Sequence, residues 1–190
     1  MSGGGFHVHG PHDHELEHAG AHGDTHAGAI AVVTAIIATV GALFAYMGGA
    51  TQANAGLYKN DAAIKKTEAS NQWNYYQSKS SKQNLSELAI ELAPEGKKAF
   101  YQEEIARYKK EKADIKKDAE KLELEAKKWD QKSADEMHQH HRWAQATTAL
   151  QIAIALAAIA LLTKKRWVEY GMYGVAGLGI AVGAAAVMHV

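Results

Sequence analysis

The 190-residue chain contains no cysteine and only two prolines. Without a thiol it can form no disulfide, no thiolate nucleophile and no cysteine-ligated zinc or iron–sulfur site. Lys and Arg together number 21, and Asp and Glu also number 21, so the formal net charge at pH 7 is zero. Nucleic-acid-binding proteins usually carry a basic excess, so we expect no nucleic-acid partner. The scarcity of proline, beside long runs of Ala, Glu and Lys, predicts an all-α protein.

Charge is missing from three long stretches of the sequence. No Asp, Glu, Lys or Arg occurs in Thr25–Tyr58, in Trp143–Thr163 or in Tyr170–Val190. A helix needs roughly 20 predominantly apolar residues to cross the hydrocarbon core of a membrane. The alternative, buried helices of a soluble bundle, is disfavoured because such helices normally keep a polar stripe. We therefore predict three transmembrane helices, at 29–50, 143–163 and 167–190, with the lipid bilayer as partner.

The segment 51–142 between the first two predicted spans holds 18 of the 21 basic and 16 of the 21 acidic residues. Its strongest break is Pro94-Glu95-Gly96, which divides it into two helical arms. We expect the arms to form a long extramembrane antiparallel hairpin with its turn near 94–96.

The second arm carries a sevenfold apolar repeat that is typical of a coiled coil. Ile105, Ala119 and Ala126 lie four residues after members of this repeat, so a seam of helix-packing residues is predicted. The members of the repeat are Tyr101, Tyr108, Ile115, Leu122 and Trp129.

The first arm contains the sequence SNQWNYYQSKSSKQNL, in which Trp73 and Tyr76 lie among amides, hydroxyls and two lysines. Two interpretations are open. The aromatic side chains can pack on the second arm while the amides hydrogen-bond across the seam, which is the usual role of aromatics at helical spacing. Alternatively, aromatics and donors together form a surface for a ligand or partner. The first interpretation is favoured.

Seven of the eleven histidines lie within residues 7–26, inside an N-terminal tail that we assign to residues 1–28. His14, His18, His22 and His26 are spaced by four, so a helix would place them on one face, where they could bind Zn²⁺, Cu²⁺ or Ni²⁺. The glycines of the tail weaken any such helix, and the alternative is a solvated tail with fortuitous metal affinity. Three further histidines, at 138, 140 and 141, suit interfacial capping of the second span.

Two features near the third span bear on packing and topology. Gly179 and Gly183 have the spacing that lets membrane helices touch closely, within or between subunits, and we expect a homo-oligomer. The short loop 164–166 is Lys-Lys-Arg, and basic residues in short loops favour the cytosolic side. This places the N-terminus in the cytosol and the hairpin in the periplasm.

Three stretches together resemble a family of bacterial membrane proteins catalogued as domain of unknown function 4337. They are SNQWNYYQSKSSKQNL, then RYKKEKADIKKDAE from Arg107, then HQHHRWAQATTALQIAIALAAIALLTKKRW from His138. The resemblance covers the chain from about residue 29 and rests on the order of these elements. It implies an integral membrane protein with three spans and a helical insert, and it brings no catalytic or cofactor-binding residues. We expect the protein in the bacterial inner membrane.

These features predict an oligomeric structural or scaffolding component of a membrane that has no catalytic activity. No nucleophile elbow, phosphate loop or zinc-protease helix occurs in the sequence. The alternative is a metal- or proton-responsive accessory protein acting through the histidine-rich tail.

Overall fold

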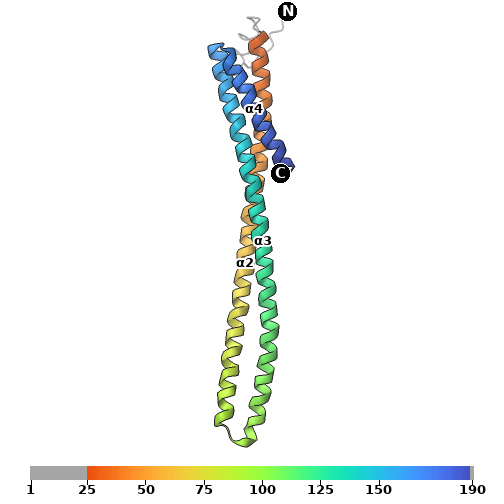
Figure 1. The fold of residues 1–190 in the computed structure, drawn as a ribbon, viewed down its shortest axis with the longest axis vertical. Coiled ribbons are helices and arrows are strands. Elements are labelled where there is room, and N and C mark those ends of the chain that lie inside the picture. The colour runs from red at the N-terminus through yellow and green to blue at the C-terminus, as the bar shows by residue number, and fades with distance from the viewer. Residues whose placement is uncertain (1–24, 189–190) are drawn as a thin grey trace, which may run out of the picture. The chain divides into compact units, whose positions relative to one another are not determined.

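The computed structural model describes residues 25–188, and these form three α-helices with no strand among them. Helix α2 is Thr25–Leu92, α3 is Glu95–Thr163 and α4 is Arg166–Val187 (Figure 1). The predicted all-α class is confirmed. All three helices are long and apolar enough to cross a membrane.

The break between α2 and α3 is set by Pro94, which has no N–H to continue the ladder of α2. The carbonyl of Pro94 accepts a 2.9 Å hydrogen bond from the Lys97 N–H and so begins the next helix. Glu95 lies in the first turn of α3, where a carboxylate interacts favourably with the helix dipole.

The connection between α3 and α4 consists of Lys164 and Lys165, and Arg166 already begins α4. Lys164 adopts a left-handed backbone conformation with φ 53°. Its N–H donates to the Ala160 carbonyl at 2.8 Å, which satisfies one of the last carbonyls of α3. Glycine is the usual residue at such a position because it has no Cβ, so this turn retains a lysine at a conformational cost.

The described chain divides into two compact units. One, called here the apolar unit, comprises residues 25–50 and 139–188 of the described chain. The other, called here the charged unit, is Thr51–His138. Helices α2 and α3 each contribute to both units, whereas α4 belongs to the apolar unit alone.

The apolar unit is held together by aliphatic side chains and very small residues. Its core comprises residues from all three helices: Ile30, Ile37, Leu150, Ala153, Ala157, Met172 and Ala176. The two core alanines of α3, Ala153 and Ala157, are fully buried, which lets neighbouring helices approach its backbone closely.

Gly179 and Gly183 of α4 are buried against the chain's own helices. A Cβ at Gly179 would lie 2.8 Å from Leu150 Cδ2, and a Cβ at Gly183 would overlap the ring of Phe44. That ring stacks at a tilt on Trp143, with centroids 5.2 Å apart, so it has little freedom to move aside. The sequence left open whether these glycines pack within or between subunits. In the structure both glycines pack within the subunit.

The charged unit consists of two helical segments that lie side by side and run in opposite directions (Figure 1). The pairs that meet across them fall in opposite order along the chain: Ala55 with Ser133, Lys65 with Glu125, and Lys79 with Glu111. On α2 the most buried positions of this unit are Ala55, Ala62, Ala69 and Gln83, which share one sevenfold repeat.

Replacing Gly183 by leucine should destabilise the apolar unit, because the new side chain overlaps Phe44. Overpacking of this kind costs about 1–3 kcal/mol, measured as a lower thermal unfolding midpoint of the detergent-solubilised protein. Gly174→Leu on the same helix is the matched control, because no atom lies within 4 Å of a Cβ built there. Equal midpoints for the two variants would contradict the assigned packing of α4.

Candidate functional site

The four histidines predicted as metal ligands can be assessed only at His26, because His14, His18 and His22 lie outside the described residues. His26 Nε2 lies 3.1 Å from Glu169 Oε2, so α2 and α4 are linked at this end of the apolar unit. Across residues 25–188, no cluster of three or more His, Asp or Glu side chains is arranged to hold a metal ion. A metal bound by the tail through His26 would have to compete with Glu169 for the ring.

The second group of histidines contributes to helix packing at one position. His140 Nδ1 forms a 2.8 Å hydrogen bond with the Gly48 carbonyl, which joins α3 to α2 within the apolar unit. Gly48 is buried, and a Cβ there would come within 3.3 Å of Trp143 Cβ. His141 is exposed, with its ring centroid 5.7 Å from that of His140. His140, which the sequence suggested for interfacial capping of the second span, therefore links α3 to α2.

The seam of the charged unit is built largely from alanine. Ala55, Ala62 and Ala69 of α2 are at most 3% exposed, as are Ala119 and Ala126 of α3. Small side chains let two helices approach closely. At one end the approach is close enough for the buried Ser133 hydroxyl to donate to the Ala55 carbonyl at 2.8 Å.

The predicted repeat of α3 points into this seam to different degrees. Tyr108 and Ile115 are buried, whereas the other three members, Tyr101, Leu122 and Trp129, are partly exposed. Trp129 stacks on Tyr58 of α2 with centroids 5.5 Å apart. Larger side chains thus border the alanine seam and close it from the side.

The aromatics of the first arm also contact α3. The Trp73 indole N–H donates to Glu123 Oε1 at 2.8 Å, and Lys112 Nζ lies 5.1 Å from the centre of the Tyr76 ring. The amides do not follow the expectation. Gln83 is buried, but its side-chain N–H donates to Glu87 on its own helix at 2.8 Å. In the part of the chain that the structure describes, no amide of residues 71–84 is seen to bond across the seam.

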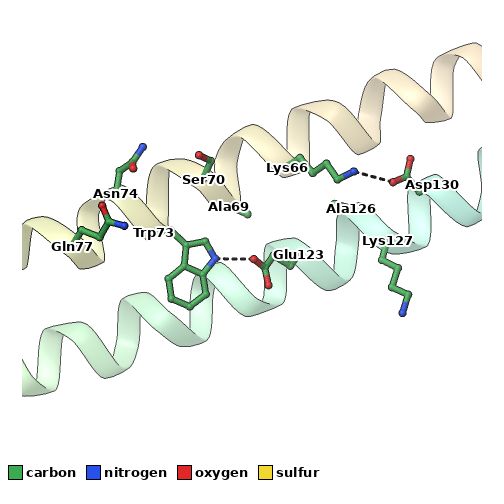
Figure 2. A pocket seen from close by; sticks show the side chains of 10 residues that line it. All are labelled: Lys66, Ala69, Ser70, Trp73, Asn74, Gln77, Glu123, Ala126, Lys127 and Asp130. Atoms are coloured by element: carbon green, nitrogen blue, oxygen red, sulfur yellow. Dashed lines mark hydrogen bonds and ion pairs between the residues drawn. The ribbon is translucent and has the colours of Figure 1, made fainter. Parts of the chain in front are cut away.

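A shallow groove of about 630 Å³ runs beside Ala69 and Ala126, lined also by Trp73 and Lys66 (Figure 2). Figure 2 shows the indole of Trp73 reaching from α2 to Glu123 and the amine of Lys66 reaching to Asp130 on α3. Four of the polar side chains that line the groove are thus bound in two cross-helix pairs. This arrangement clamps two helices together and contains no nucleophile paired with a base.

Cross-helix ion pairs flank the seam, and sequence reasoning missed them. Asp130 Oδ1 accepts from Lys59 Nζ at 2.8 Å and its Oδ2 lies 3.4 Å from Lys66 Nζ, while Lys79 Nζ lies 2.6 Å from Glu111 Oε2. The hydrogen bond from Lys59 holds the pKa of Asp130 below its ordinary value. The hydrogen bond from Lys79 likewise lowers the pKa of Glu111. Once the seam positions are assigned, these charges fall at the flanking positions, which is the signal that could have located them.

Acid should weaken the charged unit through these two carboxylates. Their pKa values are lowered in the folded chain, so each stabilises the fold above its ordinary pKa, 3.8 for Asp130 and 4.5 for Glu111. The contribution is lost as the pH falls below these values and the carboxylates take up protons. We expect the thermal unfolding midpoint to fall between about pH 5 and pH 3.

Asp130→Asn tests this acid dependence, and Asp118→Asn is the matched control. Asp118 is exposed and forms no ion pair within residues 25–188, so its replacement should leave the acid dependence unchanged. Asp130→Asn should lower the midpoint at pH 7 and flatten the profile below pH 5. Two superimposable profiles would argue against a role for the Asp130 ion pairs.

Comparisons with known proteins bear on the family alone. No curated protein and no solved structure matches the chain. The family model described as domain of unknown function (DUF4337) matches residues 26–189, which is nearly the whole length. The resemblance noted in the sequence is therefore confirmed, and the chain belongs to the family described as domain of unknown function 4337.

Proposed function

We propose that this chain is an integral membrane protein that acts as an oligomeric structural or scaffolding component without catalytic activity. In this proposal the apolar unit crosses the bilayer three times, and the charged unit is an extramembrane antiparallel hairpin packed as a coiled coil. The observation that carries the proposal is the outward-facing apolar surface of the apolar unit.

Large apolar side chains of the apolar unit point away from its core. Val32, Ile36 and Leu43 of α2 are 62%, 58% and 60% exposed, and Leu178 of α4 is 67% exposed. Soluble monomeric proteins rarely expose extensive apolar patches, whereas a lipid-facing surface consists of such side chains. A helix of about 22 residues is roughly 33 Å long, enough for a hydrocarbon core of about 30 Å.

Several hydroxyls in the apolar segments are bonded locally, which suits a bilayer. The hydroxyls of Thr34, Thr39 and Thr148 each donate to the carbonyl four residues earlier on the same helix, at 2.7, 2.9 and 2.8 Å. A hydroxyl bonded in this way leaves no donor facing hydrocarbon, where an unsatisfied group costs several kcal/mol. This supports placing these segments in lipid.

The scaffolding role is supported by the charged unit. Its α2 segment, residues 51–92, spans about 60 Å at 1.5 Å per residue. Two pairs of polar side chains in its groove, Trp73 with Glu123 and Lys66 with Asp130, bond across the helices, which favours a rigid spacer over a substrate site. A long, stiff helical pair suits a protein that holds partners at a distance from a membrane.

The topology we propose places Lys164, Lys165 and Arg166 in the cytosol, in line with the preference of basic short loops for that side. The N-terminus is then cytosolic as well, and the hairpin lies on the far side of the bacterial inner membrane. Long inserts cross largely regardless of their charge, so the many lysines of the hairpin do not oppose this arrangement.

Single cysteines in this cysteine-free chain test the topology. Ala113 in the charged unit and Thr163 at the end of α3 are both exposed. In intact cells an impermeant maleimide should label Ala113→Cys, and it should label Thr163→Cys only after lysis. The reverse pattern would invert the topology, and labelling of both in intact cells would contradict a single crossing by the second span.

The native mass of the purified protein in mild detergent tests the oligomer. We expect a mass of two or more subunits, because a structural assembly needs contacts between copies and the outer surfaces of both units remain available for them. A monodisperse monomer over a wide range of detergent and protein concentrations would contradict the scaffolding proposal.

A further inference from the structure

The charged unit has a second heptad stripe, which faces away from the seam. It runs along α2 from Leu57 to Leu88 at alternating intervals of three and four residues, and every one of its positions is exposed. We call it the outer α2 stripe. Intervals of three and four are those of a coiled-coil seam, which keeps one face of a helix directed toward a neighbour. One helix therefore carries two such seams, and α3 occupies only the inner one.

The apolar residues of the outer α2 stripe lie at its two ends, with Asn60 between the first two of them. Leu57 and Ile64 are 64% and 47% exposed, and Leu85 and Leu88 are 66% and 58% exposed. Isolated exposed leucines are ordinary on a protein surface, but Leu57, Ile64 and Leu85 share one heptad position of the stripe, and Leu88 lies at its other heptad position. Their register marks a face suited to burial against a helix.

The middle of the stripe is polar but uncharged. It contains Asn71, Asn74 and Ser78, all exposed. An amide both donates and accepts hydrogen bonds, so asparagine can pair with a second asparagine opposite it. Asparagine at a seam position in other coiled coils sets the register and the number of strands. The polar middle of the stripe is therefore suited to pairing with the same residues of a second copy in register.

No position of the stripe is charged, although this stretch of α2 is not short of charges. Eight charged residues occur between positions 51 and 90, and all lie outside the stripe. Those that form ion pairs with α3 are Lys59, Lys65, Lys66 and Lys79. Charge is thus concentrated beside the inner seam and absent from the outer one.

The exposed face of α3 differs in this respect. Between residues 109 and 121, eight of its nine exposed positions are charged, and the ninth is Ala113. Charges at such density keep a face in water, because burying them unpaired is costly. The charged face of α3 in another copy therefore cannot pack on the outer α2 stripe. The helix of the second copy must present an uncharged surface, and its own outer α2 stripe is such a surface.

We infer that the outer α2 stripe binds the same stripe of a second copy of this chain, α2 against α2, in parallel and in register. The inference rests on the proposed membrane-spanning oligomer, because copies inserted in one membrane share one orientation and their α2 helices run the same way. A contact about a twofold axis requires a self-complementary surface, and paired leucines with paired amides provide one. Gly179 and Gly183 of α4 already pack inside the subunit, so these two are not available for this contact.

Cysteine cross-linking in membranes tests the contact on the full chain. Thr67 and Ser81 both lie in the stripe, seven residues to either side of Asn74. If the helices are parallel and in register, Thr67→Cys and Ser81→Cys should each cross-link to itself with a short bismaleimide. Ala113→Cys on the charged face of α3 is the matched control and should give several-fold less dimer.

Every other pattern overturns the inference. Cross-linking only when Thr67→Cys and Ser81→Cys are mixed would mean an antiparallel contact, and equal dimer from Ala113→Cys would mean random collision. Cross-linking to a different protein would mean that the stripe binds another partner. No stripe cross-link in a protein whose native mass is oligomeric would disprove this surface while leaving the proposed function intact. A monomeric native mass would contradict both this interface and the proposed oligomeric function.

A charge introduced into the stripe gives an independent measurement. Asn71→Glu places like charges opposite each other in the dimer and should shift the native mass toward the monomer. Ala113→Glu adds the same charge to the already charged face and should leave the mass unchanged. If Asn71→Glu retains the full oligomer while the protein stays helical, the outer α2 stripe is not the interface.

Discussion

The close approach of helices along small side chains is the constraint on which the rest of this structure depends. Alanines at sevenfold spacing bring α2 and α3 together in the charged unit, until a serine hydroxyl of one helix reaches the backbone of the other. Tyr108 and Ile115 are the large side chains of the α3 repeat that are buried at this seam. Trp73, Tyr58 and Trp129 are displaced to the edges of the seam, where their rings and indole N–H contact the opposite helix.

The same constraint acts in the apolar unit through glycine and alanine. Gly179 and Gly183 let α4 rest on α3 and α2, and Gly48 accommodates Trp143 and the hydrogen bond from His140. Since lipid provides no hydrophobic force between helices, close packing and a few interhelical hydrogen bonds must hold such a unit together. The arrangement is consistent with the membrane role that we propose.

Close packing of the inner seam also determines where charge can lie. The lysines of α2 that border the seam reach carboxylates of α3, and these ion pairs lower the pKa of Asp130 and Glu111. The face of α2 that points away from α3 then contains no charge. A helix with one seam occupied and a second seam uncharged suits repeated association of identical subunits, which is the property that a scaffold requires.

The sequence by itself determined the helical class, the three apolar segments and the sevenfold repeats, because these follow from local composition and spacing. Proline at position 94 marked the end of α2 for the same local reason. The family followed from the order of three stretches of the sequence, and the family model matches residues 26–189.

Only the tertiary structure decided which partner each side chain has. The spacing of Gly179 and Gly183 is the same whether they pack within or between subunits, and the contact with Phe44 resolves it. The amides of the first arm were expected to bond across the seam, but Gln83 bonds Glu87 on its own helix, and most of the other amides of residues 71–84 are exposed. His140 was assigned to a cap and instead bonds Gly48, which is 92 residues away in sequence. Contacts between residues so distant depend on helix register and separation, and no local pattern encodes either.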